Sequence, residues 1–402
     1  MFKPVYYFDD EYISSLFPLN VRISQFFYGL CINNHIVDEF ETYISKNNYY
    51  DYILTFQNKI GYSNDLLLMG LAGNPFSSKI LRKILEIPNC FDNFYNATDD
   101  KFWTCVSGCS NDIEFLEEHL IKLDWFSLST NHNAISLLEK YPEKIQEVEL
   151  LANKNAVHLF KDLKINEILK MPNKSTRHLF VAQFYGNINA SEFIIKHVEY
   201  RIENNDKFHE DELQSLSGNP SLVSFLEKNP HLIYWKTFTM NYNAIHVLEQ
   251  NQDKINWYLL PLNQNPNIIH LIEKNIDKID WECLSTNPNA VHLIKNHYKQ
   301  MRHKMCRLSR NHSDDAIDLI REALEEMGQH GNKSEIKLIL QHLGKNPNVL
   351  KIVGKLDCQA MKTKCQPFAQ ELTTYVLNPA RLLRICDTYN LDLEEYLDIL
   401  GD

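Results

Sequence analysis

Four histidines stand at the same place in a pattern that the chain repeats, five residues after an asparagine: His158, His246, His270 and His292. Imidazole binds metal ions, forms hydrogen bonds and changes its charge near neutral pH. Equivalent positions in neighbouring helical units are about 10 Å apart, which is too far for two histidines to share one ion. A variable surface position is the favoured interpretation, because serine or lysine also occupies it, at Ser136, Ser224 and Lys351. A ridge that contacts a ligand and a pH-sensitive edge are the alternatives, and they keep His246, His270 and His292 as candidate contacts.

A basic segment at residues 295–310 is the second candidate site. It holds six positive charges and no acid: Lys295, Lys299, Arg302, Lys304, Arg307 and Arg310, with His303 among them. The segment stands out because the whole chain has a formal charge of −11. It could bind an RNA backbone or an acidic protein, and we expect the protein, because the rest of the chain repels a long polyanion. The alternative is a solvated helix face that is balanced by acids on the next helix, namely Glu322, Glu325 and Glu326.

Motifs that carry catalysis or bind cofactors do not occur in the sequence. It has no GxxxxGK[ST] phosphate loop, no HExxH zinc motif and no GxSxG nucleophile turn. The nine cysteines include no CxxC pair, and Cys105 and Cys109, which could share a helix face, have no further ligands nearby. We therefore expect a non-enzymatic protein with reduced thiols, no metal, no cofactor and no small-molecule substrate. No secretory signal and no membrane-spanning run is recognisable, which predicts a cytoplasmic protein.

A repeat must position these residues. An asparagine followed by an apolar stretch recurs at spacings of 22 to 24 residues, interrupted by spacings of 32 to 35, at Asn74, Asn131, Asn153, Asn187, Asn219, Asn241, Asn265, Asn287, Asn311, Asn346 and Asn378. Cys109 fills the place between the first two. Asparagine caps helices well, and the proline that follows it in six copies is tolerated there. We therefore expect a helix to begin within two residues of most of these asparagines. A small side chain three residues later would allow close helix packing, as at Ala134, Ala156, Ala244 and Ala290.

A second short helix is expected before each asparagine, and it contains all five tryptophans: Trp103, Trp125, Trp235, Trp257 and Trp281. We expect these side chains to be buried between units, because an aromatic ring buries roughly 150–250 Å². An aromatic row that stacks on bases or peptides is the alternative. Helices this short must stack on neighbours to be stable. The sequence therefore predicts an all-α fold, an α-solenoid of short helix pairs in units of about 22 residues with longer units of 32–35.

Three segments are expected along the chain. Residues 1–65 lack the repeated asparagine and predict a helical N-terminal cap, and residues 66–386 form the helical repeat array. Residues 387–402 are acidic and amphipathic, which fits a C-terminal cap of the kind that repeat arrays need for solubility.

Three stretches carry a resemblance to a known family: SLSTNHNAISLLEKYPEKI, MNYNAIHVLEQNQDKINW and NPNIIHLIEKNIDKIDWECLSTNPNAVHLIKN. They resemble an Asn-Pro-Asn-Ala-Ile repeat of giant DNA viruses of the mimivirus type, over roughly residues 124–160 and 213–296. The resemblance implies a viral origin and a repeat scaffold, and it supplies no catalytic residues. We therefore expect a scaffold or adaptor that binds a partner protein in the host cytoplasm or in the virion. An RNA-binding or translation-linked repeat protein that uses residues 295–310 is the alternative.

Overall fold

The computed structural model describes residues 6–8, 27–46, 65–87, 90–91, 99–169, 174–301, 307–330, 341–356 and 381–385, and the single residues 366, 370, 378 and 392. The chain divides into a larger body, residues 10–352, and a smaller body formed by residues 1–9 and 353–402. The segment boundaries expected near residues 65 and 386 adjoin stretches outside the described residues, so those three segments stay predictions.

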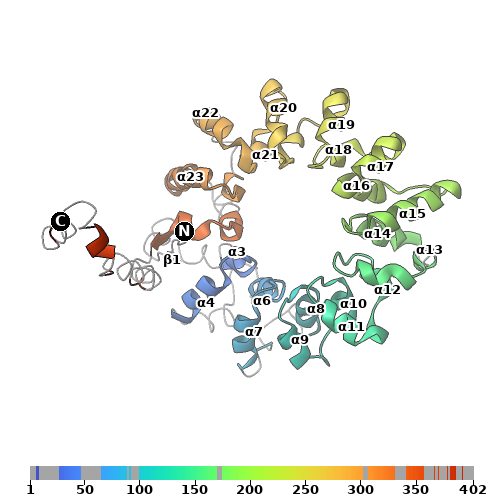
Figure 1. The fold of residues 1–402 in the computed structure, drawn as a ribbon, viewed down its shortest axis with the longest axis horizontal. Helices are drawn as coiled ribbons and strands as arrows, with labels where there is room; N and C mark the ends of the chain where they lie inside the picture. The colour runs from blue at the N-terminus through green and yellow to red at the C-terminus, as the bar shows by residue number, and fades with distance from the viewer. Residues whose placement is uncertain are drawn as a thin grey trace. The chain divides into compact units, whose positions relative to one another are not determined.

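The larger body is helical throughout its described residues, and Figure 1 shows its helices following one another in chain order. Its first half contains α3 (Phe27–Cys31), α4 (Val37–Lys46), α6 (Asp65–Ala72), α7 (Ser78–Leu85), α8 (Asp99–Cys109), α9 (Ile113–Glu118), α10 (Trp125–Thr130), α11 (Ile135–Lys140), η2 (Pro142–Lys144), α12 (Glu147–Leu150), η3 (Val157–Asp162), α13 (Ile165–Ile168) and α14 (Lys174–Tyr185).

Its second half contains α15 (Ser191–Glu203), α16 (Glu210–Gly218), η4 (Pro220–Leu222), α17 (Val223–Lys228), η5 (Pro230–Leu232), α18 (Trp235–Phe238), α19 (Ile245–Gln250), η6 (Gln252–Lys254), η7 (Leu260–Leu262), η8 (Pro266–Ile268), α20 (Ile269–Lys274), α21 (Trp281–Ser285), η9 (Pro288–Ala290), α22 (Val291–Met301), η11 (Leu308–Arg310), η12 (Asp314–Ala316), α23 (Ile317–His330) and α25 (Val349–Val353). Residues 341–345 are also helical.

The mostly helical, all-α character predicted from the sequence is confirmed. The smaller body adds one exception, a two-stranded antiparallel ribbon of β1 (Tyr6–Phe8) and β2 (Gly354–Leu356), in which Tyr7 pairs with Lys355. Among the described residues between 120 and 300 no strand occurs.

A buried asparagine ladder joins successive repeat units of the larger body. Asn153 shows the arrangement: its Nδ2 donates to the carbonyls of Ser129 and Asn131, both at 3.0 Å, and its Oδ1 accepts the Asn155 amide at 3.1 Å. Both amide protons of the side chain therefore bond to backbone carbonyls of the preceding unit. The side-chain oxygen accepts a bond that closes a turn within its own unit. The same three bonds recur at Asn74, Asn187, Asn219, Asn263, Asn287, Asn311 and Asn346.

The ladder corrects the expected helix starts. Because the asparagine oxygen accepts the amide two residues on, it closes an Asx turn before the helix rather than capping the helix directly. A 3-10 turn follows at once only after Asn219, Asn265 and Asn287. The helix begins four residues later after Asn74, Asn131, Asn153, Asn187 and Asn241, and three residues later after Asn311 and Asn346. The expectation of a start within two residues of most asparagines is wrong.

At two places in the repeat, the residue that occupies the ladder position differs from the predicted one. The ladder residue of its unit is Asn263, which is fully buried, and Asn265 lies two residues later on the surface. Between Asn74 and Asn131 the place belongs to Ser110 rather than Cys109. The Ser110 hydroxyl accepts the Asp112 amide, and its carbonyl accepts from Asn131. The asparagine pattern alone does not reveal a serine in this role.

The expected cap segment contributes a member of the ladder too. Asn33 donates from Nδ2 to the carbonyls of Gly344, at 2.8 Å, and Asn346, at 3.0 Å, and accepts the His35 amide. The first ladder residue is therefore bonded to the last. Gly29 makes the close approach possible, because a Cβ there would lie 2.8 Å from the Cα of Gly344. The expectation that residues 1–65 lack the repeated asparagine is wrong.

A second, outer ladder explains why the repeat reads Asn-x-Asn. The later asparagine donates from Nδ2 to the carbonyl that follows the ladder residue of the preceding unit, as in the 2.7 Å bond from Asn155 to His132. The same bond is made by Asn189, Asn243, Asn265, Asn289 and Asn348. Together, the two asparagines of a unit donate hydrogen bonds to as many as three backbone carbonyls of the preceding unit.

The apolar core lies beside the inner ladder. The small residues expected at the helix contacts, Ala134, Ala156, Ala244 and Ala290, are completely buried, which confirms that part of the pattern. Their neighbours on the helix face, such as Leu137 and Leu138, are buried as well. The described cysteines are thiols: Cys31, Cys90, Cys105, Cys109 and Cys283.

The ladder makes a specific stability prediction. Replacing Asn263 by Asp removes both donors and places a carboxylate against two buried carbonyl oxygens, so the free energy of unfolding should fall by about 3 kcal/mol or more. The same change at Asn265, which is only half-buried, should cost about 1 kcal/mol or less. Urea unfolding followed by circular dichroism measures both. Equal losses would show that the inner ladder does not stabilise the fold.

Candidate functional site

The basic segment is described in part. Lys295 is exposed on α22, and Arg307 and Arg310 lie at η11. Arg302, His303 and Lys304 lie outside the described residues, as does the side chain of Lys299. Arg307 Nε lies 2.9 Å from Glu282 Oε1 on α21, so its described acidic contact is on a helix earlier in the chain rather than on α23, where the balancing acids were expected.

The structure brings further basic side chains to this place. The charges of Arg310, Arg307 and Lys345 act on the buried His342, and the charge of Arg310 acts on Lys345; these four residues are called the basic cluster below. Burial, and then the charges of Arg310, Lys345 and Arg307, lower the pKa of His342 to about 4. Partial burial and the charge of Arg310 lower the pKa of Lys345. Residues 342 and 345 could not be assigned to the site from the sequence.

The histidine column is a set of histidine–glutamate contacts between units. Each of the four histidines places Nε2 beside a glutamate of the preceding unit: His158 at 3.0 Å from Glu139, His246 at 3.0 Å from Glu227, His270 at 2.8 Å from Glu249 and His292 at 3.2 Å from Glu273. Such exposed pairs stabilise a fold by about 0–1 kcal/mol.

An open groove of about 730 Å³ runs beside His246 and His270, and the exposed Tyr242 lines it. A contact role for these histidines stays a prediction.

The tryptophan row differs from its prediction. Trp103 is buried, but Trp125, Trp235, Trp257 and Trp281 are only half-buried. The fully buried position is three residues later, at Leu128, Phe238, Leu260 and Leu284. Most of the indole rings instead lie under a lysine of the following segment: Lys122 over Trp103, Lys144 over Trp125, Lys254 over Trp235 and Lys278 over Trp257, with ammonium–ring distances of 5.6, 4.7, 4.8 and 5.0 Å. The expected burial of four tryptophans is wrong, because the helix turns them to the rim of the interface.

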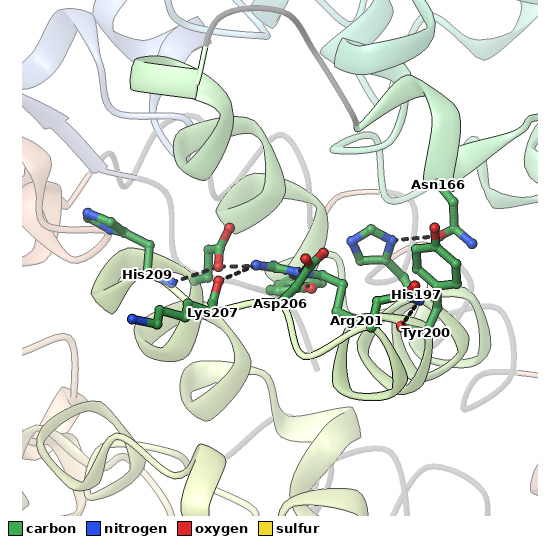
Figure 2. Close-up of polar contacts among 10 residues, drawn as sticks. Asn166, His197, Tyr200, Arg201, Asp206, Lys207 and His209 are labelled. Atoms are coloured by element: carbon green, nitrogen blue, oxygen red, sulfur yellow. Dashed lines mark hydrogen bonds and ion pairs between the residues drawn. The ribbon is translucent and has the colours of Figure 1, made fainter.

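A buried ion pair lies in one of the longer units, between Asn187 and Asn219 (Figure 2). Arg201 of α15 and Glu212 of α16 are both almost fully buried and bond at 3.0 Å. Arg201 also donates to the Lys207 carbonyl at 2.7 Å and covers the Phe208 ring at 4.4 Å. Glu212 accepts the His209 amide at 2.8 Å. The pair therefore holds the connection between α15 and α16 and fixes the start of α16.

Comparison of the chain with protein family models, with curated proteins and with solved structures found no match. None of the described helices is long and apolar enough to cross a membrane.

The half-buried tryptophans should matter less than the side chains one turn later. Trp235→Ala loses partial burial and a lysine contact, so it should cost about 1–2 kcal/mol. Phe238→Ala empties a fully buried site and should cost about 3–5 kcal/mol. Thermal and urea unfolding of the two variants compares them. A larger loss for Trp235→Ala would restore the core role first expected for tryptophan.

Breaking the buried ion pair should be costly. Glu212→Gln leaves Arg201 charged and buried without its carboxylate, which typically costs about 3–5 kcal/mol. Glu210→Gln, two residues earlier at the exposed start of the same helix, is the control and should cost about 1 kcal/mol or less. Urea unfolding measures both variants, and an unchanged midpoint for Glu212→Gln would contradict the assigned role.

Proposed function

We propose that the chain is a non-enzymatic α-solenoid scaffold that binds an acidic segment of a partner protein at the basic cluster. The observation that carries this proposal is the run of six basic residues without an acid at 295–310, in which Lys295 and Arg310 are exposed, together with the exposed Lys345 from a separate segment, whose pKa is lowered by partial burial and by the charge of Arg310. Lys295, Lys299, Arg302 and Lys304 belong to the same stretch of sequence and would extend the surface.

Electrostatics supports an anionic ligand. The basic side chains of the cluster repel one another, and a carboxylate-rich segment that binds there relieves this repulsion while forming charge-assisted hydrogen bonds. Arginine is well suited to the role, because its planar guanidinium binds carboxylates through two parallel bonds. Complementary charge of this kind contributes specificity and a fast association rate.

The asparagine ladders support a scaffold. They fix the register of each unit against the next, so equivalent side chains lie in rows, as the histidine–glutamate pairs show. Stacked repeats of this kind expose long surfaces that suit protein partners. A helical-repeat protein that reads RNA needs basic or stacking contacts in unit after unit, whereas the chain carries a net charge of −11. The resemblance to giant-virus repeat proteins supports the host cytoplasm or the virion as the setting.

The proposal is tested with the purified full chain and two labelled probes of matched charge, a poly-glutamate peptide and an RNA oligonucleotide. The variant carries Arg307→Glu, Arg310→Glu and Lys345→Glu, and the control carries the same charge change at the exposed Lys161, Lys196 and Lys228. We expect the peptide to bind in a salt-sensitive manner, and about 10-fold or more weaker to the variant than to the control.

Circular dichroism checks that both triple variants are folded, and the glutamine versions of the same three substitutions separate loss of charge from added repulsion. Equal peptide affinity for variant and control would overturn the proposal. Tighter binding of RNA than of peptide would replace it with the RNA-binding alternative. Affinity purification from infected cells with both variants, followed by mass spectrometry, then identifies the partner that only the control retains.

A further inference from the structure

Three side chains that could ligate a metal converge beside the start of α16. His178 on α14 places Nε2 3.2 Å from Asp211 Oδ2, and His209 places Nδ1 3.3 Å from the same oxygen. All three ligand atoms lie within 4.8 Å of one another, and the two imidazole rings stack with centroids 4.1 Å apart. No motif in the sequence marks them, because His178 stands 31 residues before His209.

The distances fit a first-row divalent ion. Zinc binds imidazole nitrogen and carboxylate oxygen at about 2.0–2.2 Å, so neighbouring ligand atoms around a tetrahedral ion are about 3.3–3.5 Å apart. The two histidine–aspartate distances are close to this value. Rotation of the His209 side chain, which is 54% exposed, can bring the two imidazole nitrogens to the same distance from each other.

The fold holds two of the three ligands in advance. The His209 amide donates to Glu212, and Glu212 is bonded to the buried Arg201, whose other amino group donates to the Lys207 carbonyl. Figure 2 shows His209 at the end of this network. The backbone around His209 and Asp211 is therefore rigid, while α14 brings His178 against it. Such support of ligands by buried hydrogen bonds is typical of metal sites.

We infer that His178, His209 and Asp211 form a binding site for a divalent transition metal ion, with zinc as the best match. Two imidazoles and one carboxylate leave a fourth position for water or for a donor from another molecule. Asp211 also lines an open groove of about 730 Å³ together with Leu179, Gln183 and Gln214, so an exchangeable ligand can reach that position. Metal binding replaces the weak 3.4 Å bond from the Asp211 amide to His209 Nδ1.

The test uses the purified full chain with zinc in calorimetry and with cobalt in visible absorption. One equivalent of metal should bind, with the absorption bands of four-coordinate cobalt and without a thiolate-to-cobalt charge-transfer band. His178→Ala and Asp211→Asn should weaken binding by about 100-fold or more, since loss of a supporting group alone typically costs about 10–100-fold. Zinc should also raise the melting temperature of the unaltered chain but not of these variants.

His270→Ala is the matched control, because His270 also contacts an acid on the surface but belongs to no group of three possible metal ligands among the described residues. It should bind metal like the unaltered chain. The inference is overturned if His178→Ala and Asp211→Asn keep the same stoichiometry and affinity, or if cobalt shows thiolate ligation. Circular dichroism establishes that each variant is folded, which is expected for these partly exposed side chains.

Discussion

The fold of the larger body depends on one interaction, the hydrogen bonding of a buried carboxamide at each junction between units. A carboxamide offers two donors and an acceptor in a fixed plane, and each described ladder asparagine is at most 3% exposed. A buried backbone carbonyl without a donor costs about 1–3 kcal/mol. Each short helix leaves such carbonyls in its last turn. The side chain that satisfies them therefore sets both the packing distance and the register, and the rows of surface residues follow from it.

The repeat shows which features a sequence can reveal. Its asparagines, its apolar stripes and the alanines at helix contacts were recognisable because each depends on local spacing. The first residue of each helix could not be recognised in this way, because the bonds that the asparagine forms depend on the backbone carbonyls of the preceding unit. Asn263 and Asn265 show the difficulty: both are followed by another asparagine two residues later or by proline, and only the carbonyls of the preceding unit distinguish them. Tryptophan was assigned to the core by size, whereas its place on the helix turns it to the rim.

The candidate sites were predictable to different extents. The charge of residues 295–310 is visible in the sequence, but its reinforcement by Lys345 comes from a segment that lies 35 residues beyond Arg310. Each histidine of the column contacts a glutamate one unit earlier, at a position that looks like an ordinary surface acid in the sequence. His178, His209 and Asp211 meet because α14 packs against the start of α16. Spacing within one helix could not have shown this.

The bond between Asn33 and the carbonyls of Gly344 and Asn346 has a consequence for how such a chain evolves. Tandem repeats usually change length by duplication or loss of a unit, since each copy contacts only its neighbours. Here the first junction is completed by the last, over a sequence separation of 311 to 313 residues. If a copy were added or deleted, the angle between neighbouring units would have to change slightly at all of the remaining junctions. The number of copies is thereby subject to selection as a whole, and insertions are best tolerated inside units, which is where the longer spacings of this sequence occur.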